Sequence, residues 1–68
     1  MKVGVKIFSG GAKEQTIDVR EGSTYEGLLE SLGINPEIVI VFRNGIPVPL
    51  DENVGPDNIE ILRVVTGG

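Results

Sequence analysis

A single helical stripe among strand-like segments is the feature that most limits how this chain can fold. Apolar residues recur there at i, i+3, i+4 and i+7, the spacing of one face of an α-helix, and they are Tyr25, Leu28, Leu29 and Leu32. A helix this short does not persist alone in water. It must therefore pack on another element, and the rest of the sequence offers strands.

Capping residues define both ends of this helix. Ser23 and Glu26, three residues apart, match a capping box at the start, and Thr24 is an alternative cap. Gly33 follows the last apolar position, where a left-handed residue can end the helix and let Ile34 pack back on it. The predicted helix thus occupies little more than two turns.

Two alternating segments precede the helix and predict a β-hairpin. Residues Lys2–Phe8 and residues Glu14–Arg20 both place apolar side chains at every second position, which is the pattern of a half-buried strand. Ser9–Lys13 lies between them and contains adjacent glycines, which favour a turn. This interpretation places Lys13 at the hairpin tip.

A continuous apolar run follows the helix. It begins at Glu37 or Ile38 and ends at Arg43, and its β-branched residues are typical of a strand in the middle of a sheet. Asn44–Gly45 comes next, the pair favoured in a two-residue type I′ turn because both positions need a positive φ. The chain is therefore predicted to turn back into another strand.

That next strand, Ile46–Leu50, is restricted to an edge of the sheet. Pro47 and Pro49 lack N–H groups on the same side of the strand, and only an outward-facing side tolerates both. After a loop at 51–58, Ile59–Val65 is aliphatic enough to be central. The predicted fold is α+β: a mixed five-stranded sheet in the order 2-1-5-3-4, with one helix packed on one face.

The residue types that are missing argue against catalysis. The 68 residues include no cysteine, histidine or tryptophan, so the usual thiolate nucleophile, general base and metal ligand are absent. The carboxylate pairs Glu26/Glu30 and Asp51/Glu52 are expected to face solvent. Gly10–Lys13 lacks the spacing of a phosphate-binding loop. We expect no catalytic residue, no bound metal and no cofactor.

Charge and hydrophobicity restrict the kinds of partner. Ten acidic residues against six basic ones give a net charge of −4, which disfavours nucleic acid. The apolar runs are far shorter than the ~20 residues that span a membrane, and the N-terminal residues lack a signal-peptide pattern. We expect a cytoplasmic monomer with one domain, 1–65, and a flexible di-glycine tail, 66–68.

Five segments in chain order resemble the ubiquitin-like β-grasp family: Thr24–Leu32, Phe42–Gly45, Val48–Pro49, Asp57–Arg63 and Gly67–Gly68. The likeness is to the small sulfur carriers of molybdopterin and thiamine synthesis, the MoaD and ThiS types, and to the small archaeal modifier proteins. Thiamine-type carriers often have Asp-Gly-Asp where this chain has Gly-Pro-Asp, and molybdopterin-type carriers are usually longer. The chain is therefore most similar to the archaeal modifiers.

The resemblance implies that the chain works through the carboxylate of Gly68. In this family an E1-like activating enzyme, of the MoeB, ThiF or UbaA type, uses ATP to adenylate that carboxylate. The adenylate then becomes a thiocarboxylate for a sulfur-accepting biosynthetic enzyme, or an isopeptide bond to a lysine of a target protein. The chain is thus a substrate and not an enzyme. Gly67 and Gly68 suit a narrow tunnel because they carry no side chains.

The face of the sheet away from the helix is predicted to dock a partner. Alternation along the third and last strands turns several apolar side chains outward, and a patch of a few hundred Å² usually marks an interaction site. The resemblance implies that the activating enzyme binds there, with an arginine that can orient it. Scattered surface residues, or burial under a loop, are the alternatives. The predicted docking surface consists of Ile40, Phe42, Leu62, Arg63 and Val64.

Two further hypotheses complete the prediction. If the protein is joined to another copy of itself, Lys13 is the expected acceptor, because Lys2 and Lys6 lie on a more constrained strand. The second hypothesis for function is a β-grasp interaction module that binds a partner through its sheet without C-terminal chemistry. The sequence does not choose between sulfur transfer and conjugation, since both need the same tail.

Overall fold

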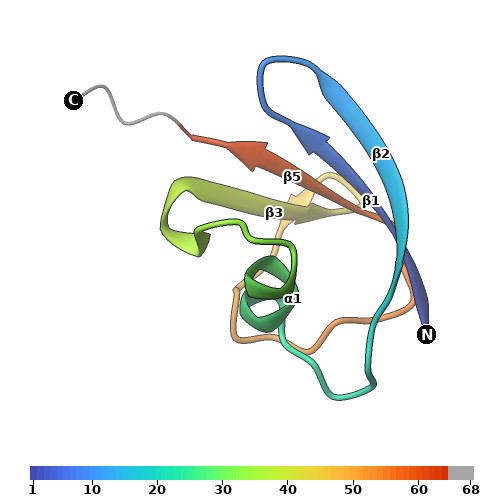
Figure 1. Cartoon of the computed structure of the whole chain (residues 1–68). Helices are drawn as coiled ribbons and strands as arrows, with labels where there is room; N and C mark the ends of the chain where they lie inside the picture. Colours follow the sequence, from blue (N-terminus) through green and yellow to red (C-terminus); the bar gives the residue numbers. More distant parts are fainter. Residues whose placement is uncertain (65–68) are drawn as a thin grey trace.

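The computed structural model describes residues 1–64. The predicted strand end at Val65 and the predicted flexible tail 66–68 lie outside the described residues. One sheet and one helix form two layers, with the helix across one face of the sheet (Figure 1). The elements are β1 (Lys2–Phe8), β2 (Ala12–Asp18), α1 (Tyr25–Ser31), a 3₁₀ helix η1 (Pro36–Ile38), β3 (Val39–Arg43), β4 (Ile46–Pro47) and β5 (Ile59–Arg63).

The sheet has five strands in the order β2-β1-β5-β3-β4, which confirms the predicted topology. β1 and β5 run parallel, and the other neighbours are antiparallel. β4 is an edge strand, and the N–H of Val48 donates to the carbonyl of Val41 at 3.0 Å. The backbone nitrogens of Pro47 and Pro49, which carry no hydrogen, therefore lie on the side of β4 that faces away from β3, as the sequence predicts.

The first hairpin turns earlier than predicted. β2 begins at Ala12, which pairs with Phe8, and Lys13 pairs with Ile7. The reversal takes three residues because Gly10 and Gly11 adopt φ angles of 70° and 156°, which residues with a Cβ rarely reach. The expectation that Lys13 lies at the hairpin tip is therefore wrong, since it is an exposed residue of edge strand β2.

Other strand boundaries also differ from the sequence prediction. The second strand ends at Asp18 and not at Arg20. The third strand begins at Val39, because Pro36–Ile38 forms η1, and the side chain of Asn35 caps it by accepting from the N–H of Glu37 at 3.0 Å. The fourth strand ends at Pro47 and not at Leu50, since a turn follows in which the N–H of Glu52 donates to the carbonyl of Pro49.

The helix begins at the alternative cap, Thr24, in place of the Ser23/Glu26 capping box, and the left-handed Gly33 terminates it as predicted. The hydroxyl of Thr24 accepts from the N–H of Gly27 at 3.2 Å. At the other end Gly33 has a φ of 74°, its N–H donates to the carbonyl of Glu30, and that of Ile34 donates to the carbonyl of Leu29. This hydrogen-bond pair is a Schellman motif, which turns the chain sharply away from the helix axis.

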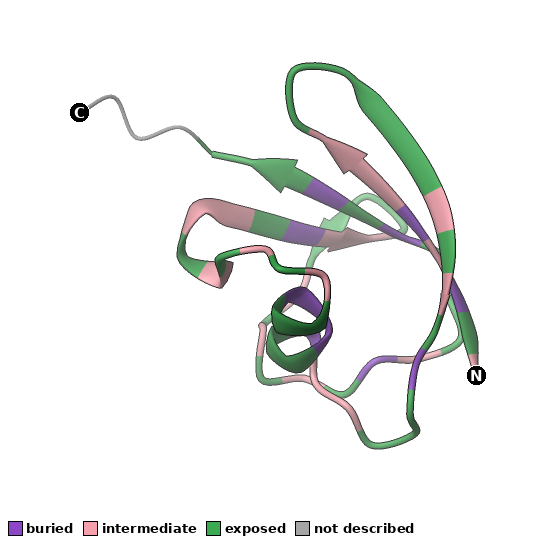
Figure 2. Ribbon diagram, in the orientation of Figure 1, coloured by how far each residue is buried: buried purple, intermediate pink, exposed green. Residues whose placement is uncertain are grey.

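The core lies between α1 and the sheet (Figure 2). Three helix residues of the predicted stripe, Tyr25, Leu28 and Leu29, are buried, and Leu32 is half-buried. No helix in the described part of the chain is long and apolar enough to cross a bilayer. The ten buried apolar residues are Val3, Val5, Val19, Tyr25, Leu28, Leu29, Val41, Val54, Ile59 and Ile61.

Candidate functional site

The end of β5 determines where the C-terminal residues begin. β5 runs parallel to β1, so both strands finish at the same end of the sheet, beside the turn at 9–11. The N–H of Val64 donates to the carbonyl of Ile38 at 2.7 Å, which holds the chain against η1 up to that residue. The predicted attachment residues Gly67 and Gly68 lie outside the described residues.

An apolar patch covers the outer face of the sheet next to this end. The strand register places Phe8, Leu62 and Ile40 side by side in one row. Leu62 and Ile40 are 42% and 40% exposed, and Val64, which follows the end of β5, is 36% exposed. We use "apolar patch" for Phe8, Ile40, Phe42 and Leu62. The predicted outward orientation of Ile40, Phe42, Leu62 and Val64 agrees with this geometry, and their role in docking stays a prediction.

Phe8 is a member of the patch that the sequence prediction missed. It lies on the outer face of β1 together with Lys6, whose ammonium nitrogen is 5.2 Å from the centre of the phenyl ring. The alternation along β1 contains the signal, because Phe8 has the same parity as the polar residues of that strand. An aromatic residue on the polar face of a strand indicates exposed apolar surface.

Arg63 does not belong to this patch. It pairs with Val39, and the next row on the same face contains Val41 and the buried Ile61. Arg63 therefore lies on the helix side of the sheet, where its Nη1 is 3.4 Å from the hydroxyl of Ser9. Neighbouring residues of a strand point to opposite faces, but at the end of β5 Arg63 also lines a hollow together with Phe8 and Leu62. The predicted role of Arg63 in docking stays a prediction.

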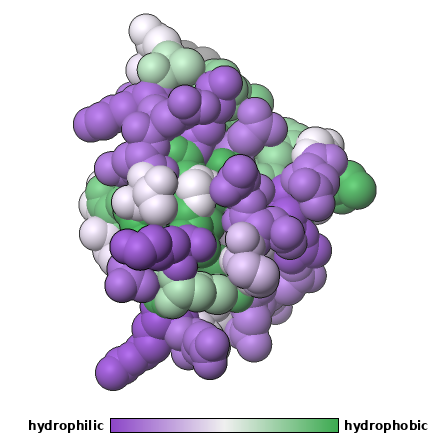
Figure 3. Space-filling model, turned by 90° about the vertical axis from the view of Figure 1, so that its right-hand side faces the viewer, coloured by the Kyte–Doolittle hydropathy of each residue, from purple (hydrophilic) through white to green (hydrophobic). Residues whose placement is uncertain are grey.

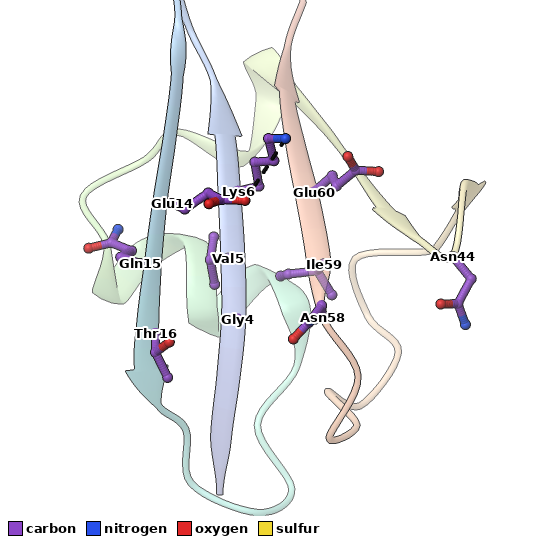
Figure 4. Close-up of a pocket in the computed structure, with 10 residues that line it drawn as sticks. All are labelled: Gly4, Val5, Lys6, Glu14, Gln15, Thr16, Asn44, Asn58, Ile59 and Glu60. Atoms are coloured by element: carbon purple, nitrogen blue, oxygen red, sulfur yellow. Dashed lines mark ion pairs between the residues drawn. The ribbon is translucent and has the colours of Figure 1, made fainter.

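The same outer face has a polar depression (Figure 4). Glu60 lines both this depression and the hollow that contains Phe8, Phe42 and Leu62, so the depression borders the apolar patch. The ammonium nitrogen of Lys6 lies 3.9 Å from a carboxylate oxygen of Glu14. Gly4 leaves room for the side chain of Asn58, since a Cβ at residue 4 would lie 2.5 Å from the Asn58 side-chain oxygen and that side chain would have to shift. The polar side chains that line the depression include Lys6, Glu14, Thr16, Asn44, Asn58 and Glu60.

An apolar patch beside a polar depression is the usual composition of a protein interface, with an apolar centre and a polar rim. The depression offers carboxylates, amides, a hydroxyl and one ammonium group, so it can accept and donate hydrogen bonds. In residues 1–64 no group of three or more Asp or Glu residues could hold a metal ion. This face thus combines apolar side chains with hydrogen-bonding groups.

One ion pair tethers the loop at 51–58 to the rest of the fold. Arg43 donates to a carboxylate oxygen of Glu52 at 2.7 Å and to the hydroxyl of Tyr25 at 3.3 Å. The hydrogen bond to Tyr25 and that to Glu52 raise the pKa of Arg43 above its ordinary value. Glu52 is thus a structural ion-pair partner, which corrects the expectation that the Asp51/Glu52 pair merely faces solvent.

The side of the molecule that carries β2 is mostly covered by hydrophilic residues (Figure 3). Every residue of β2 except Gln15 and Ile17 is exposed. Lys13 lies at the start of this strand, on the helix side of its row with Ile7. This edge therefore differs in chemistry from the apolar patch on the outer face.

A family model described as small archaeal modifier protein 2 matches residues 1–65. An uncharacterized protein from Archaeoglobus fulgidus is 41% identical over 68 residues, which cover 100% of both chains. The small archaeal modifier protein 2 of Haloferax volcanii is 32% identical over 68 residues, which again cover 100% of both chains.

Two solved structures are similar to this chain in their fold. The crystal structure of SAMP1 from Haloferax volcanii has a TM-score of 0.71 and 22% identity, with 100% of both chains covered. A ubiquitin-like protein from Caldiarchaeum subterraneum has a TM-score of 0.65 and 16% identity, with 98% of this chain and 100% of that chain covered. At these identities the likeness establishes a ubiquitin-like β-grasp fold.

Proposed function

The chain belongs to the small archaeal modifier protein 2 family and is a ubiquitin-like modifier, not a catalyst, and we propose that it acts through the carboxylate of Gly68. In the proposed reaction this carboxylate attacks the α-phosphate of ATP on an E1-like activating enzyme of the MoeB, ThiF or UbaA type, and pyrophosphate leaves. A nucleophile then attacks the acyl carbon of the adenylate, and AMP leaves. Sulfide from a sulfur donor gives a thiocarboxylate, and a lysine amine, which loses a proton, gives an isopeptide bond.

The observation that carries this proposal is the apolar patch beside the end of β5. Leu62 is 42% exposed and lies six residues before Gly68. Six extended residues span at most about 20 Å. A partner that covers the patch can therefore present its ATP site within reach of Gly68, while the polar depression supplies the rim of the contact.

The proposal is tested by incubating the chain with ATP, magnesium and the activating enzyme of the same organism. We expect ATP–pyrophosphate exchange that depends on the chain, because adenylation is reversible. With a sulfur donor added, the intact mass should show one oxygen replaced by sulfur. With a target protein added, it should show a conjugate.

A sample without ATP is the control for these mass changes. If the chain forms a complex with the activating enzyme but supports no pyrophosphate exchange and keeps its mass, the proposal is wrong. The chain would then be an interaction module that binds a partner through its sheet alone.

We predict that Lys13 is the main acceptor if copies of the chain are joined to one another. Lys13 is exposed on edge strand β2, whereas the ammonium of Lys6 lies near both the Glu14 carboxylate and the Phe8 ring. Lys6 is therefore less free to reach the activated carboxylate of a second copy. Replacing Lys13 with arginine should remove most linked copies, and Lys6→Arg should remove few.

Trypsin digestion and tandem mass spectrometry identify the acceptor directly. Cleavage after Arg63 leaves residues 64–68 attached to the modified lysine. A remnant found mainly on Lys2 or Lys6 would contradict the assignment to Lys13.

A further inference from the structure

A groove with apolar walls opens on the helix side of the sheet, at the end of the sheet where β5 finishes. Three neighbouring strands form its floor through Ile7, Ile61 and Val39. The segment between α1 and η1 forms the wall through Ile34, and η1 adds Ile38. The groove has a volume of about 320 Å³, near the lower end of the range for ligand sites. We call it the helix-side groove.

Backbone hydrogen bonds fix both sides of this groove. At Gly33 the chain turns away from α1, so the helix leaves this end of the sheet uncovered. The N–H of Ile34 donates to the carbonyl of Leu29 at 2.9 Å, and the N–H of Val64 donates to the carbonyl of Ile38 at 2.7 Å. Ile34 and Val39 pack on the core and are only half-buried. The groove therefore exists before any partner binds.

The charge at the groove is opposite to that of the protein as a whole. Arg63 is the only charged residue among the described residues that line it, although the chain has a net charge of −4. Its guanidinium meets a neutral group, the hydroxyl of Ser9, at the long distance of 3.4 Å. An arginine at the border of an apolar groove selects a carboxylate, because its planar fork can donate two parallel hydrogen bonds.

We infer that the helix-side groove binds an extended segment of a partner protein in which a large aliphatic side chain is followed by an acidic residue. The aliphatic side chain enters between Ile34 and Val39, and the carboxylate pairs with Arg63. The groove and the apolar patch lie on opposite faces of the sheet, so one copy of the chain can hold both partners. This inference does not depend on the chemistry proposed for Gly68.

Titration with synthetic peptides, followed by amide NMR shifts of the chain, tests the inference. The probe is acetyl-Ser-Leu-Glu-Ser-amide, and the matched control is acetyl-Ser-Leu-Gln-Ser-amide. The glutamate peptide should give saturable shifts at Ile34, Ile38 and Arg63. The glutamine peptide should bind about tenfold more weakly, which corresponds to the loss of one charge-assisted contact.

Two charge-reversal variants test which arginine of the chain pairs with the carboxylate of the peptide. Arg63→Glu should abolish the preference for the glutamate peptide and create one for acetyl-Ser-Leu-Lys-Ser-amide. Arg20→Glu changes the net charge equally at another exposed arginine, which does not line the groove, and should leave binding unchanged. Equal affinity for the glutamate and glutamine peptides, shifts centred on Phe8 and Leu62, or no saturable shift would each overturn the inference. ATP–pyrophosphate exchange reports on Gly68 separately.

Discussion

Deletion of Gly68 should abolish ATP-dependent activation and leave the fold intact. Without this residue the reacting carboxylate lies short of the partner's ATP site by about 3.3 Å. A near-attack arrangement requires reacting atoms about 3–3.5 Å apart, and an error of about 1 Å already costs about 100-fold in rate. Pyrophosphate exchange should therefore fall to background, and so should every later step.

The fold should survive this deletion because the buried core described here runs from Val3 to Ile61. The free energy of unfolding, measured with urea, should change by less than about 0.5 kcal/mol. Gly68→Ala is the matched control, since it keeps the length of the chain and adds one methyl group where the partner has to approach the backbone. It should retain more activity than the deletion.

Pyrophosphate exchange by the Gly68 deletion at the rate of the full chain would refute the C-terminal mechanism. Binding to the activating enzyme has to be measured in the same experiment. If binding also persists unchanged, the sheet alone accounts for the function, and the interaction-module hypothesis replaces the proposal.

Local signals in the sequence were sufficient to predict the sheet order. Pro47 and Pro49 put the fourth strand at an edge, and the aliphatic density of the third and fifth strands put both in the middle. Thr24 and Gly33 determined the helix ends in the same way, through a cap and a left-handed residue. Each signal depends on residues close together in the chain, which is why sequence reasoning could find it.

The errors arose where a boundary depends on backbone geometry. The position of Lys13 follows from a three-residue reversal at 9–11, which needs positive φ at both Gly10 and Gly11. A glycine pair permits this turn without requiring it, so the sequence allowed a longer one. The start of β3 moved because Asn35 and Pro36 initiate η1, a short-range preference that competed with the β-branched run.

Features that join distant residues could not be predicted. Arg43 contacts Tyr25 and Glu52, which are 18 and 9 residues away along the chain, and no periodic pattern connects them. The helix-side groove has the same origin, because its wall is the segment after α1 and its floor is three strands. By contrast, strict alternation along the strand was sufficient to predict that Arg63 points to the opposite face from Leu62.

Substitutions at the neighbouring residues Ile61 and Leu62 should have opposite consequences. Ile61 is fully buried on the helix side, and Leu62 is 42% exposed on the outer face. Ile61→Ala should lower the free energy of unfolding by about 2–5 kcal/mol through lost contacts and a cavity. That is a large fraction of the stability of a small domain. Leu62→Glu should cost at most about 1 kcal/mol, which is the range of strand propensity at an exposed position.

The two substitutions should affect activation by the activating enzyme in the reverse order, with the larger loss at Leu62. Leu62→Glu places a charge in the centre of the proposed contact, where desolvation of an unpaired carboxylate is costly, so kcat/KM should fall by at least about tenfold at temperatures where the variant is folded. Ile61→Ala, compared at a temperature where it is also folded, should be activated almost normally. Ile46→Glu is the matched control, since Ile46 is 65% exposed on β4 and lies outside the apolar patch.

Urea unfolding and pyrophosphate-exchange kinetics on the same three variants give the answer. If Leu62→Glu loses as much stability as Ile61→Ala, its side chain belongs to the core and the outer face is not a free surface. If Leu62→Glu is activated as well as Ile46→Glu, the activating enzyme binds elsewhere. Only a selective loss of activation in Leu62→Glu supports docking on the apolar patch, because all three chains keep the same C-terminal residues.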